Sequence, residues 1–222
     1  MSENNRTQIL TRLRAQCTPW TDAQDLDPDG AVLGPAFANH AARLEAFAAA
    51  VAQSGAQLDR AATAAEVRDA LLGTAAASGA AEVVVPEPQV AAFLNTCVGP
   101  GAVLAQRAVR PDDALAVVWA EAGIAETGTL VVSDRIECPA QSNFLPAHWV
   151  VILHALDLVD HFEAYWDSRA RTGQTGPRSL HWITGPSRTA DIGMQMQVGA
   201  HGPIGVHVLL LTGELGIHDL EA

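Results

Sequence analysis

The sequence predicts a three-layer α/β domain, with a central, mostly parallel sheet between helices, and a short N-terminal helical extension. Helical and β-branched segments alternate along the chain, which is typical of a sheet with helices on its faces. Hydrophobic residues make up 49% of the 222 residues, enough for a full core. We therefore predict an N-terminal helix and connecting loop at residues 1–36 and one α/β domain at residues 37–222.

The first half of the chain is predicted to be mainly helical. Ile9, Leu10 and Leu13 share one side of a short amphipathic helix, and a loop rich in Pro, Asp and Gly follows. Apolar residues at helical intervals then predict helices at residues 37–54, 64–77 and 88–96. Short apolar runs between them predict strands at residues 57–59, 82–85 and 102–105.

The second half of the chain is predicted to supply most of the sheet. Apolar and β-branched runs predict strands at residues 115–120, 130–133, 148–153, 181–184, 194–198 and 206–211. Helical spacing at residues 158–171 predicts one further helix.

Charge and composition exclude several classes of function. The formal net charge is −12, and all 13 basic residues are arginine. Without a basic stripe the chain has no electrostatic footprint for nucleic acid, and we expect no nucleic-acid partner. Without lysine it has no P-loop lysine and no Schiff-base residue. An anion bound here must be held by arginine, backbone amides or helix ends.

The cysteines and apolar runs bear on cofactors and location. Cys17, Cys97 and Cys138 are widely separated, so this chain alone cannot supply an iron–sulfur or structural zinc site, and we expect no metal in it. The longest apolar runs fall far short of the roughly 20 residues that span a bilayer. The polar start is unlike a secretory signal, so we expect a cytoplasmic protein without a membrane span.

The segment 183–203 carries the densest group of polar residues. A predicted strand runs into a Gly-Pro break and then into what could be the first turn of a helix. In that arrangement Ser187 is the N-cap, while free amides and Arg188 hold an anion. Asp191 could orient Arg188 or a neighbouring histidine. The alternative is a helix cap with a local ion pair. The candidate ligand-binding residues are Gly185, Ser187, Arg188, Thr189 and Asp191.

A second motif, at residues 123–129, lies between two apolar runs. Glu126 could act as a general base, nucleophile or hydrogen-bond acceptor. Thr127 and Thr129 can contact polar atoms of a ligand, and Gly128 lets the backbone approach it closely. The alternative is a turn between strands whose glutamate is solvated.

Two histidines complete the candidate site. His201 and Gly202 lie in a Gly- and Pro-rich break, where a histidine could act as acid, base or ligand-orienting donor. His148 opens a predicted strand and could face the same cleft. For both, a histidine that only satisfies local backbone groups is the alternative.

Together these motifs resemble the lactate-utilisation protein C family (LutC/YkgG), within the wider LUD-domain group. The resemblance rests on GIAETGTLVVSD at 123–134, NFLPAHWVVI at 143–152, ITGPSRTADI at 183–192 and GAHGP at 199–203. One departure is Gly193, where the family usually has an acidic or amide residue. The resemblance implies a fold similar to ribose-5-phosphate isomerase, glucosamine-6-phosphate deaminase and CoA transferases.

The resemblance also implies a function and partners. It implies an accessory subunit of an L-lactate-oxidising system, a component of an L-lactate dehydrogenase complex that forms pyruvate, with iron–sulfur clusters in two partner proteins. The ligand in the cleft would be a small carboxylate or another anion. Two alternatives remain: a stand-alone CoA-transferase- or isomerase-like enzyme that uses Glu126, and a binding or scaffold module without chemistry.

Overall fold

The computed structural model describes residues 7, 11, 34–99, 102–136, 138–172, 177–190, 196–199 and 201–215, with the backbone alone at 189–190 and 196–198. Contacts divide the chain into two units, Met1–Leu33 and Gly34–Ala222. In the first unit, the helical Thr11 donates its hydroxyl to the Thr7 carbonyl oxygen at 2.8 Å. The rest of the predicted N-terminal helix and most of the loop lie outside the described residues. The predicted boundary after residue 36 stays a prediction.

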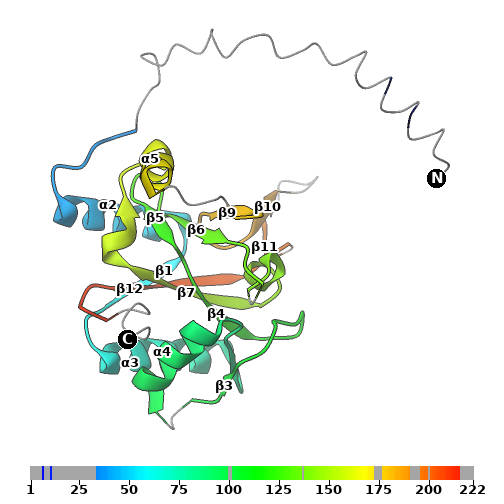
Figure 1. Ribbon diagram of the computed structural model, residues 1–222. Helices are drawn as coiled ribbons and strands as arrows, with labels where there is room; N and C mark the ends of the chain where they lie inside the picture. The colour runs from blue at the N-terminus through cyan, green and yellow to red at the C-terminus, as the bar shows by residue number, and fades with distance from the viewer. Residues whose placement is uncertain are drawn as a thin grey trace. The chain divides into compact units, whose positions relative to one another are not determined.

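A parallel six-stranded sheet forms the centre of the second unit (Figure 1). Its order is β1-β12-β7-β4-β2-β3, and all five pairs of neighbours run parallel. The central strands are continuous hydrophobic runs, as expected when both faces of a parallel sheet are covered. The strands are β1 (Gln57–Ala61), β2 (Val83–Val84), β3 (Leu104–Ala105), β4 (Leu115–Trp119), β7 (His148–His154) and β12 (Gly205–Leu211). The predicted α/β class with a parallel sheet is confirmed.

Two helices cover one face of this sheet (Figure 1). α3 (Ala64–Ser78) begins at a capping box in which Thr63 and Glu66 satisfy each other's backbone amides. α4 (Pro88–Val98) begins with proline, whose fixed φ suits the first helical position. Their apolar sides form a core with the sheet residues that face them, among them Leu115, Val117, Val150, Ile152, Leu209 and Leu211.

The opposite face is covered by α2 (His40–Ser54) and by a second sheet. This sheet has the order β8-β5-β6-β9, and α5 (Phe162–Thr172) packs against it. Its strands are β5 (Ala122–Ile124), β6 (Thr129–Ser133), β8 (Leu158–Val159) and β9 (Leu180–Ile183). The second sheet was not predicted, because β5 and β8 have only 3 and 2 residues, too few for a periodic signal.

Shorter elements complete the fold. The 3-10 helices η3 (Ala140–Asn143) and η4 (Ala155–Asp157) flank β7. β10 (Arg188–Ala190) and β11 (Met196–Val198) pair antiparallel as a separate hairpin. The predicted strand at 194–198 corresponds to β11. The helical turn predicted to begin at Ser187 is wrong, because residues 188–190 are extended and pair with β11.

Candidate functional site

A row of three threonine hydroxyls joins the two polar motifs. Thr129 opens β6 beside the end of β9, because Leu130 pairs with Ile183 in antiparallel register. The Thr129 hydroxyl oxygen lies 2.7 Å from that of Thr127 and 2.7 Å from that of Thr184. Thr129 is buried and Thr184 is exposed, so the row leads from the interior to the surface. Each hydroxyl can donate and accept, and the outer one can bind a polar group.

Two glycines allow the motifs to pack directly on α2. Gly128 has φ +68°, and a Cβ there would lie 2.6 Å from the Val51 amide nitrogen. Gly185 has φ +73°, and a Cβ there would lie 2.6 Å from the Ser54 hydroxyl oxygen. Both positions thus require a left-handed backbone and offer no space for a side chain. Both glycines were predicted to contact a ligand; in the structure they contact α2.

Ser187 and Arg188 face different neighbours. Successive side chains of an extended segment point to opposite sides. A Cβ on Gly202 would lie 3.3 Å from the Ser187 Cβ, whereas a Cβ on Gly55 would meet the Arg188 guanidinium. The predicted anion cradle, which combined the Ser187 cap, helix-end amides and Arg188, is therefore not formed.

Arg188 lies beside the C-terminal end of α2, which ends at Gly55 in the left-handed conformation. A cation at this end complements the helix dipole. The Arg188 side chain is exposed, and no carboxylate in the described part of the chain lies within ion-pair distance of it. The proposed partner Asp191 lies outside the described residues, and Thr189 is described by its backbone alone.

Glu126 is separated from Arg188. Its amide donates to the Asp160 carbonyl oxygen at 3.1 Å, and its Oε2 would lie 2.7 Å from a Cβ on Gly34. Asp160 in turn forms an ion pair with Arg43, close to the start of α2. α2 has 15 residues, so roughly 22 Å of helix lies between this region and the end where Arg188 is found. Glu126 is exposed, and these contacts do not place it opposite Arg188.

His201 and Gly202 line a shallow hollow of about 460 Å³. Gly202 separates this hollow from Ser187, whose amide donates to the Pro203 carbonyl oxygen at 3.0 Å. His201 is exposed there. The other lining residues are Pro111, Phe144, Leu145, Pro146, Ala147, Gly199 and Ile204, so His201 is the ionisable side chain of a mainly apolar hollow.

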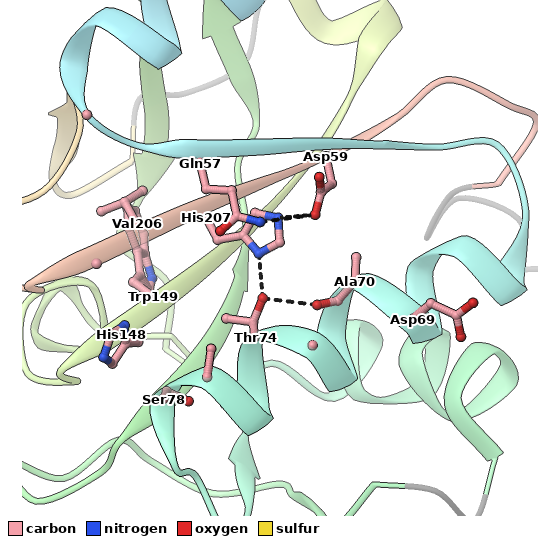
Figure 2. Close-up of a pocket in the computed structure, with 14 residues that line it drawn as sticks. Gln57, Asp59, Asp69, Ala70, Thr74, Ser78, His148, Trp149, Val206 and His207 are labelled. Atoms are coloured by element: carbon pink, nitrogen blue, oxygen red, sulfur yellow. Dashed lines mark hydrogen bonds and ion pairs between the residues drawn. The ribbon is translucent and has the colours of Figure 1, made fainter.

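His148 lines a different and larger cavity, of about 550 Å³, between α3 and the amino ends of β1, β12 and β7 (Figure 2). We call it the β1–α3 cavity. His148 and Gly205 are neighbours in register, and a Cβ on Gly205 would lie 2.5 Å from the His148 Nδ1. The lining residues are Gly55, Gln57, Asp59, Asp69, Ala70, Gly73, Thr74, Ala77, Ser78, His148, Trp149, Gly205, Val206 and His207.

A polar chain of Thr74, His207 and Asp59 crosses this cavity (Figure 2). The Thr74 hydroxyl oxygen lies 2.6 Å from the His207 Nδ1, and the Asp59 Oδ2 lies 3.0 Å from the Nε2. Burial lowers the pKa of His207, although the Asp59 charge opposes this effect. Sequence reasoning missed this group. The available signal was a histidine inside the otherwise apolar run of β12.

The two described cysteines lack the properties of reactive or metal-binding thiols. Cys97 and Cys138 are buried free thiols. Burial, followed by the nearby Glu87 carboxylate, raises the pKa of Cys138 to about 12. A thiol protonated at neutral pH is a poor nucleophile and a poor metal ligand. No group of three or more His, Cys, Asp or Glu side chains suited to a metal ion occurs in the part of the chain that the structure describes.

The structure is that of an α/β protein with a parallel central sheet. Its two polar motifs pack on α2, a helix that covers one face of this sheet. Residues 112–211 match the model of the LUD domain, the group that the resemblance named. A crystal structure of a DUF162 family protein from Deinococcus radiodurans has a TM-score of 0.56 at 18% identity, over 78% of this chain and 98% of that one. This likeness supports the fold alone.

Several curated relatives share one name. Lactate utilization protein C of Geobacillus thermodenitrificans is 32% identical over 99 residues, 43% of this chain and 41% of the relative. Lactate utilization protein C of Bacillus subtilis is 29% identical over 99 residues, again 43% and 41%. The matched stretch thus spans less than half the length of these relatives. Among the described residues, no helix is long and apolar enough to cross a membrane.

Proposed function

We propose that this protein acts in lactate utilisation, as a cytoplasmic accessory subunit of an L-lactate-oxidising system whose iron–sulfur clusters reside in partner proteins. The observation that carries the proposal is the LUD domain at residues 112–211, which contains both polar motifs and is shared with relatives named lactate utilization protein C. The 3 cysteines of the sequence form no cluster motif, which agrees with electron carriers held elsewhere.

The proposed ligand is a small carboxylate bound at Arg188. Three features support this position. The Arg188 guanidinium is exposed, it has no acidic partner among the described residues, and its planar fork suits a carboxylate. Two hydroxyl groups flank Gly185 on the neighbouring segments: Thr184, which is exposed at the end of the threonine row, and Ser54, whose hydroxyl oxygen would lie 2.6 Å from a Cβ on Gly185.

The role in an assembly is tested by native co-purification. The tagged full chain is isolated from its own host grown on lactate, and the eluate is assayed for iron, sulfide and lactate-dependent dye reduction. We expect iron-containing partners and dye reduction in the wild-type eluate. An eluate without iron, together with unimpaired growth on lactate after deletion of the chain, would refute the role.

The ligand site is tested separately by calorimetric titration with L-lactate and pyruvate. Loss of a charge-assisted pair is worth about 1.4 kcal/mol, so Arg188→Ala should weaken binding about tenfold. Arg178→Ala is the control, because Arg178 is also exposed and has no ion-pair partner among the described residues. Equal affinities for the two variants would exclude Arg188 from the site while leaving the role in the assembly intact.

A further inference from the structure

The β1–α3 cavity is polar at a place where helix packing predicts apolar side chains. Val67 and Leu71 of α3 are fully buried in the core against the sheet. The same stripe continues at helical spacing to Thr74 and Ser78. The sheet-facing side of α3 therefore changes from apolar to polar within one turn, at the point where the cavity begins.

The strands opposite α3 change in the same way and at the same level. On β12, Leu209 is buried against α3, and His207 precedes it on the same face. On β1, Ala61 is buried, and Asp59 and Gln57 precede it on that face. Gln57 is the register partner of His207. Three separate elements thus place polar groups around one space, which core packing alone does not require.

Small residues keep this space open. Ala70, Gly73 and Ala77 lie on the cavity side of α3, and Gly205 lies at the start of β12. A Cβ on Gly73 would have no atom within 4 Å. An alanine at Gly73 would therefore meet no steric obstacle and would favour the helix, so the fold does not require a glycine here.

The hydrogen bonds of Thr74 decide which ring nitrogen of His207 carries the proton. The Thr74 hydroxyl contacts the Ala70 carbonyl oxygen at 3.0 Å, and because a carbonyl can only accept, the hydroxyl donates to it. The His207 Nδ1, 2.6 Å from the same hydroxyl oxygen, must then be the donor. In the neutral ring the Nε2 is an acceptor, next to the Asp59 carboxylate at 3.0 Å.

Two acceptors therefore lie side by side. The neutral Gln57 side-chain amide donates to the Asp59 Oδ2 at 3.3 Å, and no charged donor lies between the Asp59 Oδ2 and the His207 Nε2 among the described residues. The Nε2 makes no well-formed hydrogen bond within the described part of the chain, although His207 is only 4% exposed. Asp59 has no arginine within ion-pair distance among the described residues, whereas Asp69, the other carboxylate of the lining, is paired with Arg68 at 2.9 Å. Neither arginine nor lysine is among the described lining residues. A donor with positive charge is the group that satisfies both acceptors.

We propose that the β1–α3 cavity binds a small organic cation bearing an ammonium group, which donates hydrogen bonds to the Asp59 carboxylate and to the His207 Nε2. The Thr74 hydroxyl contacts the His207 Nδ1 (Figure 2), and this contact leaves the Nε2 as the acceptor. Asp59 supplies the charge that attracts the cation. This inference goes beyond the proposed function, since Arg188 is not a lining residue of the cavity, although its guanidinium lies beside the lining residue Gly55.

The test uses three probes of similar size that differ in charge: 4-amino-1-butanol, 1,4-butanediol and 4-hydroxybutyrate. Each is titrated into the full chain while the ¹⁵N resonances of the His207 ring are followed by NMR, with assignment through His207→Gln. The amine should shift the Nε2 signal with a Kd of about 1 mM. The diol should bind at least tenfold more weakly, and the carboxylate should cause no shift at His207.

Matched variants identify the groups responsible. Asp59→Asn should weaken amine binding at least tenfold, whereas Asp69→Asn, in the same lining, should change it less than threefold. Gly73→Leu should block binding by filling the cavity while preserving the thermal transition.

Protonation of His207 removes its acceptor and adds a like charge, so amine affinity should fall at pH values below the His207 pKa. Three other ionisable groups of the described residues lie at or beside the cavity: Asp69 on α3, which is paired with Arg68, His148 on β7, and Arg188, whose guanidinium lies beside the lining residue Gly55. The same titration is therefore repeated in His148→Gln and Arg188→Ala.

Four results would overturn the proposal. These are equal or tighter binding of 4-hydroxybutyrate, equal effects of the two aspartate variants, no shift of the His207 ring by the amine at concentrations that saturate a millimolar site, and unchanged amine binding in Gly73→Leu.

Discussion

Substitution of Gly128 by alanine tests whether the second polar motif is built to pack on α2. Gly128 has φ +68°, and an added Cβ would lie 2.6 Å from the Val51 nitrogen and 2.7 Å from the Ala50 carbonyl carbon. Backbone atoms of a helix cannot move aside as a flexible side chain can. The β5–β6 turn must therefore lift away from α2 or adopt another conformation.

The matched control is Gly79→Ala at the end of α3. Gly79 also has φ +68°, but a Cβ there would have no atom within 4 Å. Gly79→Ala should therefore lower the free energy of unfolding only by the cost of placing alanine in the left-handed conformation, about 1–2 kcal/mol. Gly128→Ala adds overpacking, which costs about 1–3 kcal/mol, so its total should be roughly 2–5 kcal/mol. The difference between the variants isolates the contact with α2.

Urea unfolding at 25 °C measures both variants, with the m-value checked for constancy. A loss of about 3 kcal/mol is a large fraction of the stability of a typical domain, so the shift in midpoint is easily resolved. Equal losses for Gly128→Ala and Gly79→Ala would refute the close packing. A Gly128→Ala protein that kept its stability but lost lactate binding would instead support the prediction that Gly128 contacts the ligand.

Two further predictions concern buried ionisable groups. The Arg107 guanidinium and the Arg110 amide hold the pKa of Asp113 below its usual value. The ionised Asp113 therefore contributes to the free energy of unfolding above about pH 4, and this contribution is lost as the pH falls through the folded-state pKa. Asp113→Asn should cost about 2–4 kcal/mol at pH 7, and this cost should shrink in acid; a cost that stays constant to pH 3 would contradict the assignment. For His207, burial lowers the pKa, so the unfolded chain binds a proton first and stability falls as pH drops below about 6.5, levelling off below the folded-state pKa. His207→Gln should remove this part of the pH dependence of the unfolding free energy, and parallel curves for the two proteins would count against a buried neutral ring.

The main sheet could be predicted because its elements have strong local signals. α2 and α3 are periodic, begin at Asn39 and Thr63 with side-chain caps, and end at left-handed glycines. β4, β7 and β12 are apolar runs that belong to a fully covered parallel sheet. The second sheet could not be predicted, because its pairing is decided by contacts between segments far apart in sequence, such as Leu130 with Ile183.

The candidate site was predicted only in part, for a physical reason. Residues 183–190 combine a Gly-Pro break, a serine and an arginine, a pattern that a helix start and a hairpin strand share. The pairing of Arg188 with Val198 makes this segment a strand and not a helix start. In the extended backbone, the side chains of Ser187 and Arg188 then point to opposite sides. The contact between Thr129 and Thr184 did bring the two motifs together, although Thr184 was not among the predicted site residues.

The polar residues of the β1–α3 cavity were hidden by the elements that carry them. In the sequence, Gln57 and Asp59 belong to a predicted short strand, Thr74 is one hydroxyl on a helix, and His207 is an isolated residue in an apolar run. Each is unremarkable alone, because one polar residue on an amphipathic element is common. Their meaning comes from register: the pairing of Gln57 with His207 and the packing of α3 over both strands place all four around one space. The loops between elements, where polar motifs are usually sought, therefore do not indicate this cavity. It is indicated by neighbouring elements that change from apolar to polar residues at the same height in the fold.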